Sequence, residues 1–297
     1  MSSYLIDAPI HIFRYYFALP PHWHSRSGYA TEAVYGFTNL LLDMLARRPR
    51  HIVCAFDESL GSCFRNALYP TYKCSRALPD AALAYQLAAC REMAEALGIA
   101  SFASERYEAD DILATLTRKL RRYAPVIVSR DKDLGQLLAR GASSLWDLVA
   151  DRRLDSEALE QRFGVRPEQI ADYLALVGDR GDDIPGIPGL GPKTASCLLR
   201  EFEDIEALLA QLDRMAVLPL RGAKGTAARL EQYADQLRLA KRLTCLEENM
   251  ALDINPGQLR PQSVDLYLAL ALAGEFGISD LGGKMMRILG CAHGESE

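Results

Sequence analysis

Three short apolar runs, each followed closely by aspartate, constrain the fold of this chain more than any other sequence feature. The runs and their acids are residues 4–6 with Asp7, residues 51–56 with Asp57, and residues 125–129 with Asp131. Other segments have apolar residues at the spacing of three and four that is typical of amphipathic helices. These segments are 31–47, 80–97 and 109–122. The alternation predicts an α/β fold with a mainly parallel central sheet.

The acids that end the three runs are expected to lie close together. In an open parallel sheet the functional crevice lies at the carboxyl ends of the strands. One aspartate after a strand is easily explained as a turn residue. Three in succession, delivered from distant parts of the chain, favour a shared acidic site.

Two further acidic stretches extend this set. Glu108, Asp110 and Asp111 open the predicted helix 109–122, and Glu108 and Asp111 share a face because they are three residues apart. Like charges held this close repel unless a cation neutralises them. Asp179 and Asp182 show the same spacing in a Gly/Asp-rich turn. Carboxylates alone suit Mg²⁺ or Mn²⁺ better than Zn²⁺, and this many predict two ions about 3.5–4 Å apart.

A glycine- and proline-rich hairpin, residues 184–195, follows the last acids between predicted helices at about 167–177 and 192–202. Gly189 and Gly191 are expected to adopt backbone angles closed to other residues. The N–H groups of such a turn can face an anion at a helix N-terminus, where Pro192 fits the first position and Lys193 adds charge. Pro192 also breaks the Gly-Lys-Ser/Thr ending of a nucleotide-binding P-loop. A purely structural turn is the alternative.

Composition narrows the class of protein. A net charge of −5 argues weakly against a nucleic-acid partner, but basic residues outnumber acids in 44–79 and in 214–242, which includes Arg221. The seven cysteines show no C-x-x-C spacing and the five histidines no H-E-x-x-H pattern, which disfavours zinc and disulfides. No secretion signal or bilayer-length apolar run is present in the sequence, so we expect a cytoplasmic protein.

Taken together, the motifs identify a family resemblance. The matching motifs are Phe56-Asp57, Phe64-Arg65, Tyr72-Lys73-x-x-Arg76, Tyr107 to Asp111, Ser129 to Asp133, Gly178-Asp179-x-x-Asp182 with Ile184-Pro185-Gly186, and Gly189 to Ala195. In order and spacing the chain resembles the 5′-nuclease family, which includes the N-terminal domain of bacterial DNA polymerase I, phage 5′ exonucleases and flap endonucleases. The resemblance covers most of residues 4–245.

The resemblance implies a PIN-like α/β domain followed by an all-α helix–hairpin–helix (H3TH) domain. The expected boundaries are 1–165 for the catalytic domain, with an arch at about 65–90, 166–250 for the DNA-binding domain, and 251–297 for a helical C-terminal extension. No polymerase region is visible, so the expectation is a stand-alone nuclease, acting as a monomer.

The same resemblance implies roles for individual residues. Ligands of the first metal, or residues beside it, would be Asp7, Asp57, Glu108, Asp110 and Asp111. The second-metal group would be Asp131, Asp133, Asp179 and Asp182. Arg65 and Lys73 would touch the scissile phosphate and, with Asp110 and Asp131, form the catalytic set. DNA contacts would come from Arg65, Lys73, Arg76, Gly189, Gly191, Lys193 and Thr194. Backbone carbonyls of Gly186, Gly189 and Gly191 would hold K⁺. Arg76 can equally be a solvated surface charge.

Two departures from the family pattern stand out. Ala8 and Pro9 follow Asp7 where the family has Gly and then Ser or Asn, and Pro9 is expected to stiffen a turn there. Asp183 replaces a common Asn. The expected activity is metal-dependent 5′-3′ exonuclease or flap endonuclease action on DNA, without sequence preference. The alternatives are a PIN-type ribonuclease acting on RNA or RNA primers, and a branched-DNA-binding protein that has lost catalysis.

Overall fold

A six-stranded sheet forms the centre of the N-terminal half. The computed structural model describes residues 1–59, 61–217 and 223–290. Arg221 and residues 291–297 of the predicted C-terminal extension lie outside them. The strands are β1 (Ser3–Asp7), β2 (His51–Ala55), β3 (Ala100–Phe102), β4 (Val126–Val128), β5 (Ser144–Asp147) and β6 (Arg152–Leu154). Their order is β3-β2-β1-β4-β5-β6.

The sheet is parallel except for its last strand. β1 pairs in parallel with β2 and β4, and only β6 runs antiparallel to its neighbour β5. Every residue of β1, β2 and β4 is buried, as expected for strands covered on both faces. The predicted fold class is confirmed. β3, β5 and β6 were not predicted, because three or four residues are too few to show a period.

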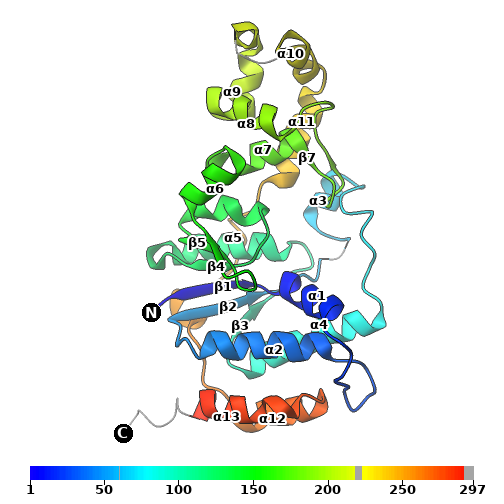
Figure 1. Cartoon of the computed structure of the whole chain (residues 1–297), viewed down its shortest axis with the longest axis vertical. Helices are drawn as coiled ribbons and strands as arrows, with labels where there is room; N and C mark the ends of the chain where they lie inside the picture. Colours follow the sequence, from blue (N-terminus) through cyan, green and yellow to red (C-terminus); the bar gives the residue numbers. More distant parts are fainter. Residues whose placement is uncertain (60, 218–222, 291–297) are drawn as a thin grey trace.

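Helices cover both faces of the sheet (Figure 1). One face packs against α1 (Ala8–Ala18), α2 (Glu32–Leu45), α4 (Ala81–Ala96), α12 (Leu266–Glu275) and α13 (Gly282–Gly290), so residues from near the C-terminus return to the first half of the chain. The other face packs against α5 (Ala109–Leu120) and, beyond it, the helices of the second half.

Pro9 does not stiffen a turn, as we had expected, but lies in the first turn of helix α1, directly after β1. A proline is tolerated there because the first N–H groups of a helix have no partner within the helix. Asp7 is therefore both the last residue of β1 and the residue that precedes α1. A strand thus passes into a helix with no loop between them, which holds the Asp7 carboxylate firmly at the sheet edge.

The predicted arch, residues 65–90, is shorter in the structure. It contains the short helix α3 (Phe64–Leu68) and the non-helical residues 69–80, which run down one side of the molecule (Figure 1). From residue 81 onward the chain forms α4, and Ala89, Cys90 and Met93 pack into the core. Residues 81–90 therefore belong to the body of the domain.

The second half is helical and stacks on the sheet side that carries α5. Its helices are α6 (Ser156–Phe163), α7 (Ile170–Val177), α8 (Pro192–Glu201), α9 (Ile205–Ala210), α10 (Ala223–Gln232) and α11 (Ala234–Thr244). Between α7 and α8 lie β7 (Gly178–Asp179) and β8 (Ile184–Pro185), a two-stranded antiparallel ribbon. Within the described part of the chain, none of the helices has the length and apolar character needed to cross a bilayer.

Candidate active site

A cavity of about 950 Å³ lies at the carboxyl ends of β2, β1 and β4. Among the described residues, eight carboxylates line it: Asp7, Asp57, Glu108, Asp110, Asp131, Asp133, Asp179 and Asp182. Five cationic side chains line it as well: Arg14, Lys73, Arg76, Arg130 and Lys132. Acids from five separate stretches of the sequence therefore do meet in one place.

Short local hydrogen bonds fix the acids at the strand ends. The Ser129 hydroxyl donates to Asp7 Oδ2 at 2.7 Å and accepts from the backbone N–H of Asp131 at 3.0 Å. Asp57 Oδ1 accepts from the N–H and the hydroxyl of Ser59 at 3.1 and 2.9 Å. Ser129 therefore ties the end of β1 to the loop after β4, so that Asp7 and Asp131 are presented together.

Burial and mutual repulsion make several of these carboxylates hard to ionise. Burial, with the charges of Asp131 and Asp57, raises the pKa of Asp7 to about 7. Burial and the charge of Asp7 raise the pKa of Asp110 well above its ordinary value. The pKa of Asp57 is raised by burial and by the charge of Glu108. The protein alone does not neutralise this acidic cluster, which is the electrostatic condition for binding a cation.

The second group of acids surrounds Lys132. Its Nζ lies 2.5 Å from Asp179 Oδ2 and 3.0 Å from Asp133 Oδ1, although the geometry at the latter oxygen makes no hydrogen bond. Burial and the charge of Asp131 raise the pKa of Asp133 to about 7. For Asp179, burial alone would raise the pKa, but the hydrogen bond and charge of Lys132 outweigh it and leave the pKa lowered.

The loop at 72–76 is bound to the acidic turn at 179–183. The Lys73 N–H donates to the carbonyl of Asp182 at 3.0 Å, and Arg76 Nη2 lies 2.5 Å from Asp182 Oδ1. The Tyr72 hydroxyl lies within 2.8 Å of Glu108 Oε2 and 3.1 Å of Asp182 Oδ2. Lys73 has a φ of +54°, a strained value for a residue with a side chain, and its ammonium contacts the Glu108 carboxylate. This loop therefore places cations at the base of the predicted arch, inside the cavity.

The donor set fits divalent cations, although amines hold part of it here. In the part of the chain that the structure describes, no three His, Cys, Asp or Glu side chains already form a metal-binding group. The ion pairs of Lys73 and Lys132 explain this, because these amines lie among the acids that would converge on a metal. The eight acids still outnumber the five cations, and carboxylate oxygens are the ligands that Mg²⁺ and Mn²⁺ prefer.

Arg65 and Asp111 form a buried ion pair outside the cavity, so Asp111 lies beside the candidate metal ligands and not among them, and the roles of both residues stay predictions. Asp111 is fully buried and does not line the cavity; its carboxylate accepts from Arg65 at 2.7 and 2.8 Å and from the N–H of Glu247 at 2.8 Å. Arg65 is only 1% exposed and also donates to Glu108 and to the carbonyls of Leu243 and Cys245. The cation expected beside Glu108 and Asp111 is thus the Arg65 guanidinium.

The hairpin before α8 differs from expectation in one respect. Gly189 has a φ of +74°, but Gly191 does not adopt a positive φ and precedes α8 in extended backbone. The carbonyl of Gly186 accepts from Gln236 at 3.2 Å, and that of Gly191 accepts from two N–H groups of α8. Arg229 Nη1 donates to the Pro188 carbonyl at 3.1 Å, so a guanidinium already lies on the turn. These contacts use part of the acceptor capacity of the carbonyls, and the K⁺ site stays a prediction.

Lys193 and Thr194 lie in the first turn of α8, and the side chain of Lys193 is exposed. Both are accessible for contact with a phosphate. Arg76, interpreted from sequence as a surface charge or a DNA contact, lines the cavity with its side chain 55% exposed. Its guanidinium therefore remains open to a ligand on one side.

Sequence reasoning missed several residues of the cavity. Tyr72 and Lys132 each stood inside a recognised motif, and for Lys132 its position between Asp131 and Asp133 was the available signal. Phe13, Phe17 and Leu78 form an apolar part of the lining, and Phe17 and Leu78 are 76% and 71% exposed. The apolar residues of 8–18, had they been interpreted as a helix after Asp7, would have pointed to the two phenylalanines.

The fold and the cavity define a two-domain protein, with an acidic site at the edge of a parallel sheet and a helical domain behind it. The family models for the 5′-3′ exonuclease N-terminal resolvase-like domain and C-terminal SAM fold match residues 2–164 and 165–266. The chain belongs to the 5′-3′ exonuclease family, as the motifs predicted.

Individual relatives agree with this membership. The 5′-3′ exonuclease of Aquifex aeolicus is 32% identical, over 89% of this chain and 88% of that protein. DNA polymerase I of Pseudomonas aeruginosa is 37% identical over 91% of this chain, which spans about a third of the length of such polymerases. Among solved structures, the T5 D15 protein co-crystallised with metal ions matches with a TM-score of 0.67 at 20% identity, over 97% of this chain and 99% of that one. The catalytic core of Rad2 in complex with a DNA substrate matches with a TM-score of 0.64 at 14% identity, over 97% and 91%. These two likenesses concern the fold.

Proposed function

We propose that this chain is a divalent-metal-dependent nuclease that hydrolyses phosphodiester bonds of DNA at 5′ ends and 5′ flaps. One observation carries the proposal: eight carboxylates from distant segments line a single cavity, with cationic side chains beside them. Family membership supports it, since the matching families and the Aquifex relative are named for 5′-3′ exonuclease activity. The solved structure of the Rad2 catalytic core is a complex with a DNA substrate.

The acids divide into two groups that would hold two Mg²⁺ or Mn²⁺ ions. Asp7, Asp57 and Asp110 lie near the end of β1. Asp131, which the resemblance assigned to the second group, is joined to Asp7 through Ser129, and Asp133, Asp179 and Asp182 lie around Lys132 and Lys73. Glu108 lines the cavity between the cations and the first group. Bound divalent ions lower the pKa of a water molecule and stabilise charge on the leaving oxygen.

The lysines and Arg76 act on the substrate phosphate in this proposal. Lys73 and Lys132 neutralise acids in the protein without metal, and their long side chains can turn to phosphoryl oxygens once those acids are otherwise neutralised. Arg76 has an exposed face beside Asp182. Together these cations offset the charge that develops on the phosphoryl group in the transition state.

DNA would contact the protein on both sides of the cavity. Lys193 and Thr194 at the start of α8, with Arg229 on the adjacent turn, provide backbone contacts that carry no sequence information. Phe13, Phe17 and Leu78 offer apolar surface to an unpaired base at the 5′ end. In this proposal residues 1–165 carry catalysis and residues 166–250 bind DNA, and the protein acts as a monomer in the cytoplasm.

The test is cleavage of a labelled 5′ flap in Mg²⁺ by the double variant Asp131→Asn/Asp133→Asn. We expect the rate to fall by at least a thousandfold, because both acids lie where the two groups meet. A matched control is Asp43→Asn/Asp253→Asn, which makes the same change in net charge at two exposed positions. Cleavage by the first variant at the wild-type rate would refute the proposal. Flaps of identical sequence in DNA and RNA separate deoxyribonuclease from ribonuclease action.

A further inference from the structure

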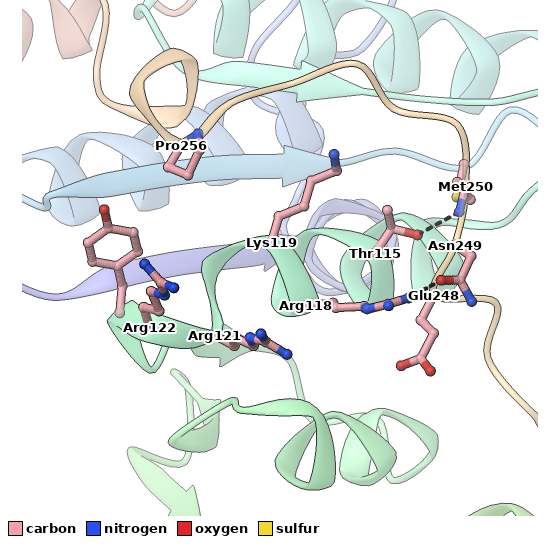
Figure 2. A pocket seen from close by; sticks show the side chains of 10 residues that line it. Thr115, Arg118, Lys119, Arg121, Arg122, Glu248, Asn249, Met250 and Pro256 are labelled. Atoms are coloured by element: carbon pink, nitrogen blue, oxygen red, sulfur yellow. Dashed lines mark hydrogen bonds between the residues drawn. The ribbon is translucent and has the colours of Figure 1, made fainter.

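A second pocket of about 600 Å³ lies at the far end of α5, away from the acidic cavity. One wall is the last turn of α5 with the 3-10 turn Arg121–Tyr123, and the other is the chain at 248–256. Figure 2 shows Arg118 directed toward Asn249, with Lys119, Arg121 and Arg122 at the same end of the helix. Asp110 and Lys119 are nine residues apart on α5, which is about 14 Å along the helix axis, so one phosphate cannot occupy both sites.

The pocket is rich in positive charge that the protein does not neutralise. Arg118, Lys119, Arg121 and Arg122 line it, together with one acid, Glu248. The Glu248 carboxylate lies 2.7 Å from Nε of Arg140, so it is already paired. A helix C-terminus carries only about half a negative charge, which stabilises one cation near it but does not neutralise four.

Two of these cations have no partner among the described residues. Arg118 donates to the Asn249 side chain, and Lys119 Nζ lies 3.4 Å from the carbonyl of Ile254. Arg121 and Arg122 are exposed, and neither guanidinium makes a hydrogen bond or an ion pair with any residue in the described part of the chain. Guanidinium groups bind phosphate through paired N–H donors, and two lie here side by side in sequence.

The opposite wall is held in place by hydrogen bonds to the same helix. The N–H of Glu247 donates to Asp111 Oδ1 at 2.8 Å, and the N–H of Met250 donates to the Thr115 hydroxyl at 3.4 Å. Figure 2 shows this second contact at the edge of the pocket. The pocket is therefore a structured recess with two fixed walls, of a size that accommodates a small ligand.

We propose that this recess binds the phosphate groups of a small ligand, either a nucleoside phosphate or free inorganic phosphate or pyrophosphate. The recess lies between two fixed walls, a shape that suits a small ligand better than the broad backbone of duplex DNA. Arg121 and Arg122 are the main phosphate ligands, and Lys119 adds charge from the adjacent position. The inference does not depend on the proposed nuclease activity.

The experiment measures binding of pyrophosphate by calorimetry in EDTA, at constant ionic strength, for wild-type protein and the variant Arg121→Gln/Arg122→Gln. The matched control is Arg26→Gln/Arg152→Gln, which removes two charges from side chains that are 75% and 73% exposed. We expect at least a tenfold loss of affinity in the first variant and none in the control. Equal affinities in all three proteins would overturn the proposal, since binding would then lie elsewhere, for instance at the cations of the acidic cavity.

Two further measurements sharpen the result. Because both arginines are exposed, the melting temperature of Arg121→Gln/Arg122→Gln without ligand should stay within about 2 °C of wild type. A drop above about 5 °C would assign the pair a structural role and overturn the proposal. Tenfold tighter binding of dAMP than of inorganic phosphate would identify a nucleotide as the ligand, and equal binding would identify the phosphate group alone. Flap cleavage by this variant should remain at the wild-type rate.

Discussion

Replacing Arg65 with methionine tests whether this arginine stabilises the fold or contacts DNA. A guanidinium has five N–H donors, and Arg65 uses them on the Asp111 and Glu108 carboxylates and the carbonyls of Leu243 and Cys245. No donor remains for a phosphate, and the side chain is 2% exposed. Methionine fills much of the same volume but leaves the Asp111 carboxylate buried without its cation.

The expected loss of stability is large. Removing one partner of a buried ion pair costs about 3–5 kcal/mol. For a protein of this size each kcal/mol lowers the melting temperature by roughly 2–4 °C, so Arg65→Met should lower it by roughly 6–20 °C. The comparison variant is Arg76→Gln, which removes an arginine with a side chain 55% exposed and should cost no more than about 1 kcal/mol.

The assay is thermal unfolding of a double-mutant cycle made from Arg65→Met and Asp111→Asn. The double variant should be more stable than the sum of the single effects predicts, by about 1–3 kcal/mol, because neutralising Asp111 removes the unpaired charge. The reasoning would be refuted if Arg65→Met had the same melting temperature as the wild-type protein but no longer cleaved the flap. Arg65 would then act on the substrate, as the family resemblance had implied.

Four other outcomes follow from the cavity and the hairpin. Below pH 7, metal affinity should fall about tenfold per pH unit for each proton that the metal displaces. The reason is that the pKa values of Asp7 and Asp133 are raised to about 7, and metal binding requires the ionised carboxylates. Mn²⁺ titrations between pH 5.5 and 8 that show no change in affinity would contradict this. Without metal, these raised pKa values mean that the folded state binds more protons than the unfolded state between about pH 4 and 7. The free energy of unfolding should therefore decrease as the pH rises through that window. Urea denaturation in EDTA measures this free energy, and an increase with rising pH would contradict the account. Asp110→Asn should abolish cleavage but raise the melting temperature in EDTA, since it removes a carboxylate that repels Asp7; a lower melting temperature would show that the charge is already compensated. Because the Arg229 guanidinium lies on the turn at Pro188, flap binding should be equal in K⁺ and Na⁺ at one ionic strength and fall roughly tenfold in Arg229→Gln; a wild-type requirement for K⁺ would instead support the ion site that the resemblance implies.

The sequence predicted the parts of the fold in which apolar residues recur at a regular spacing. The helices observed at Glu32–Leu45, Ala81–Ala96 and Ala109–Leu120 match the predicted ranges within about two residues, because apolar side chains recur every three or four positions there. Strands β1, β2 and β4 were likewise apparent as short apolar runs. β3 and β5 were not, since their strand character depends on pairing with neighbours that are distant in sequence.

The sequence predicted which acids belong to the candidate site but not which side chains form ion pairs with one another. The rule that strands deliver their last residues to one edge was enough to place Asp7, Asp57 and Asp131 together. The direction of each side chain at the start of α5 was not available from spacing. Glu108 and Asp111 form a reciprocal capping box, yet only Glu108 lines the cavity and Asp111 faces Arg65. A buried partner 46 positions away decided this, and no local pattern encodes it.

The most direct test of the central claim is a crystal structure of the protein soaked with Mn²⁺, with anomalous diffraction used to locate the metal. The account predicts Mn²⁺ inside the cavity, held by oxygens of Asp7, Asp110, Asp131, Asp133 and Asp179, with Lys132 displaced from its pairing with Asp179. A structure at saturating Mn²⁺ with no metal peak in the cavity, and with Lys132 and Lys73 still paired to the acids, would contradict it.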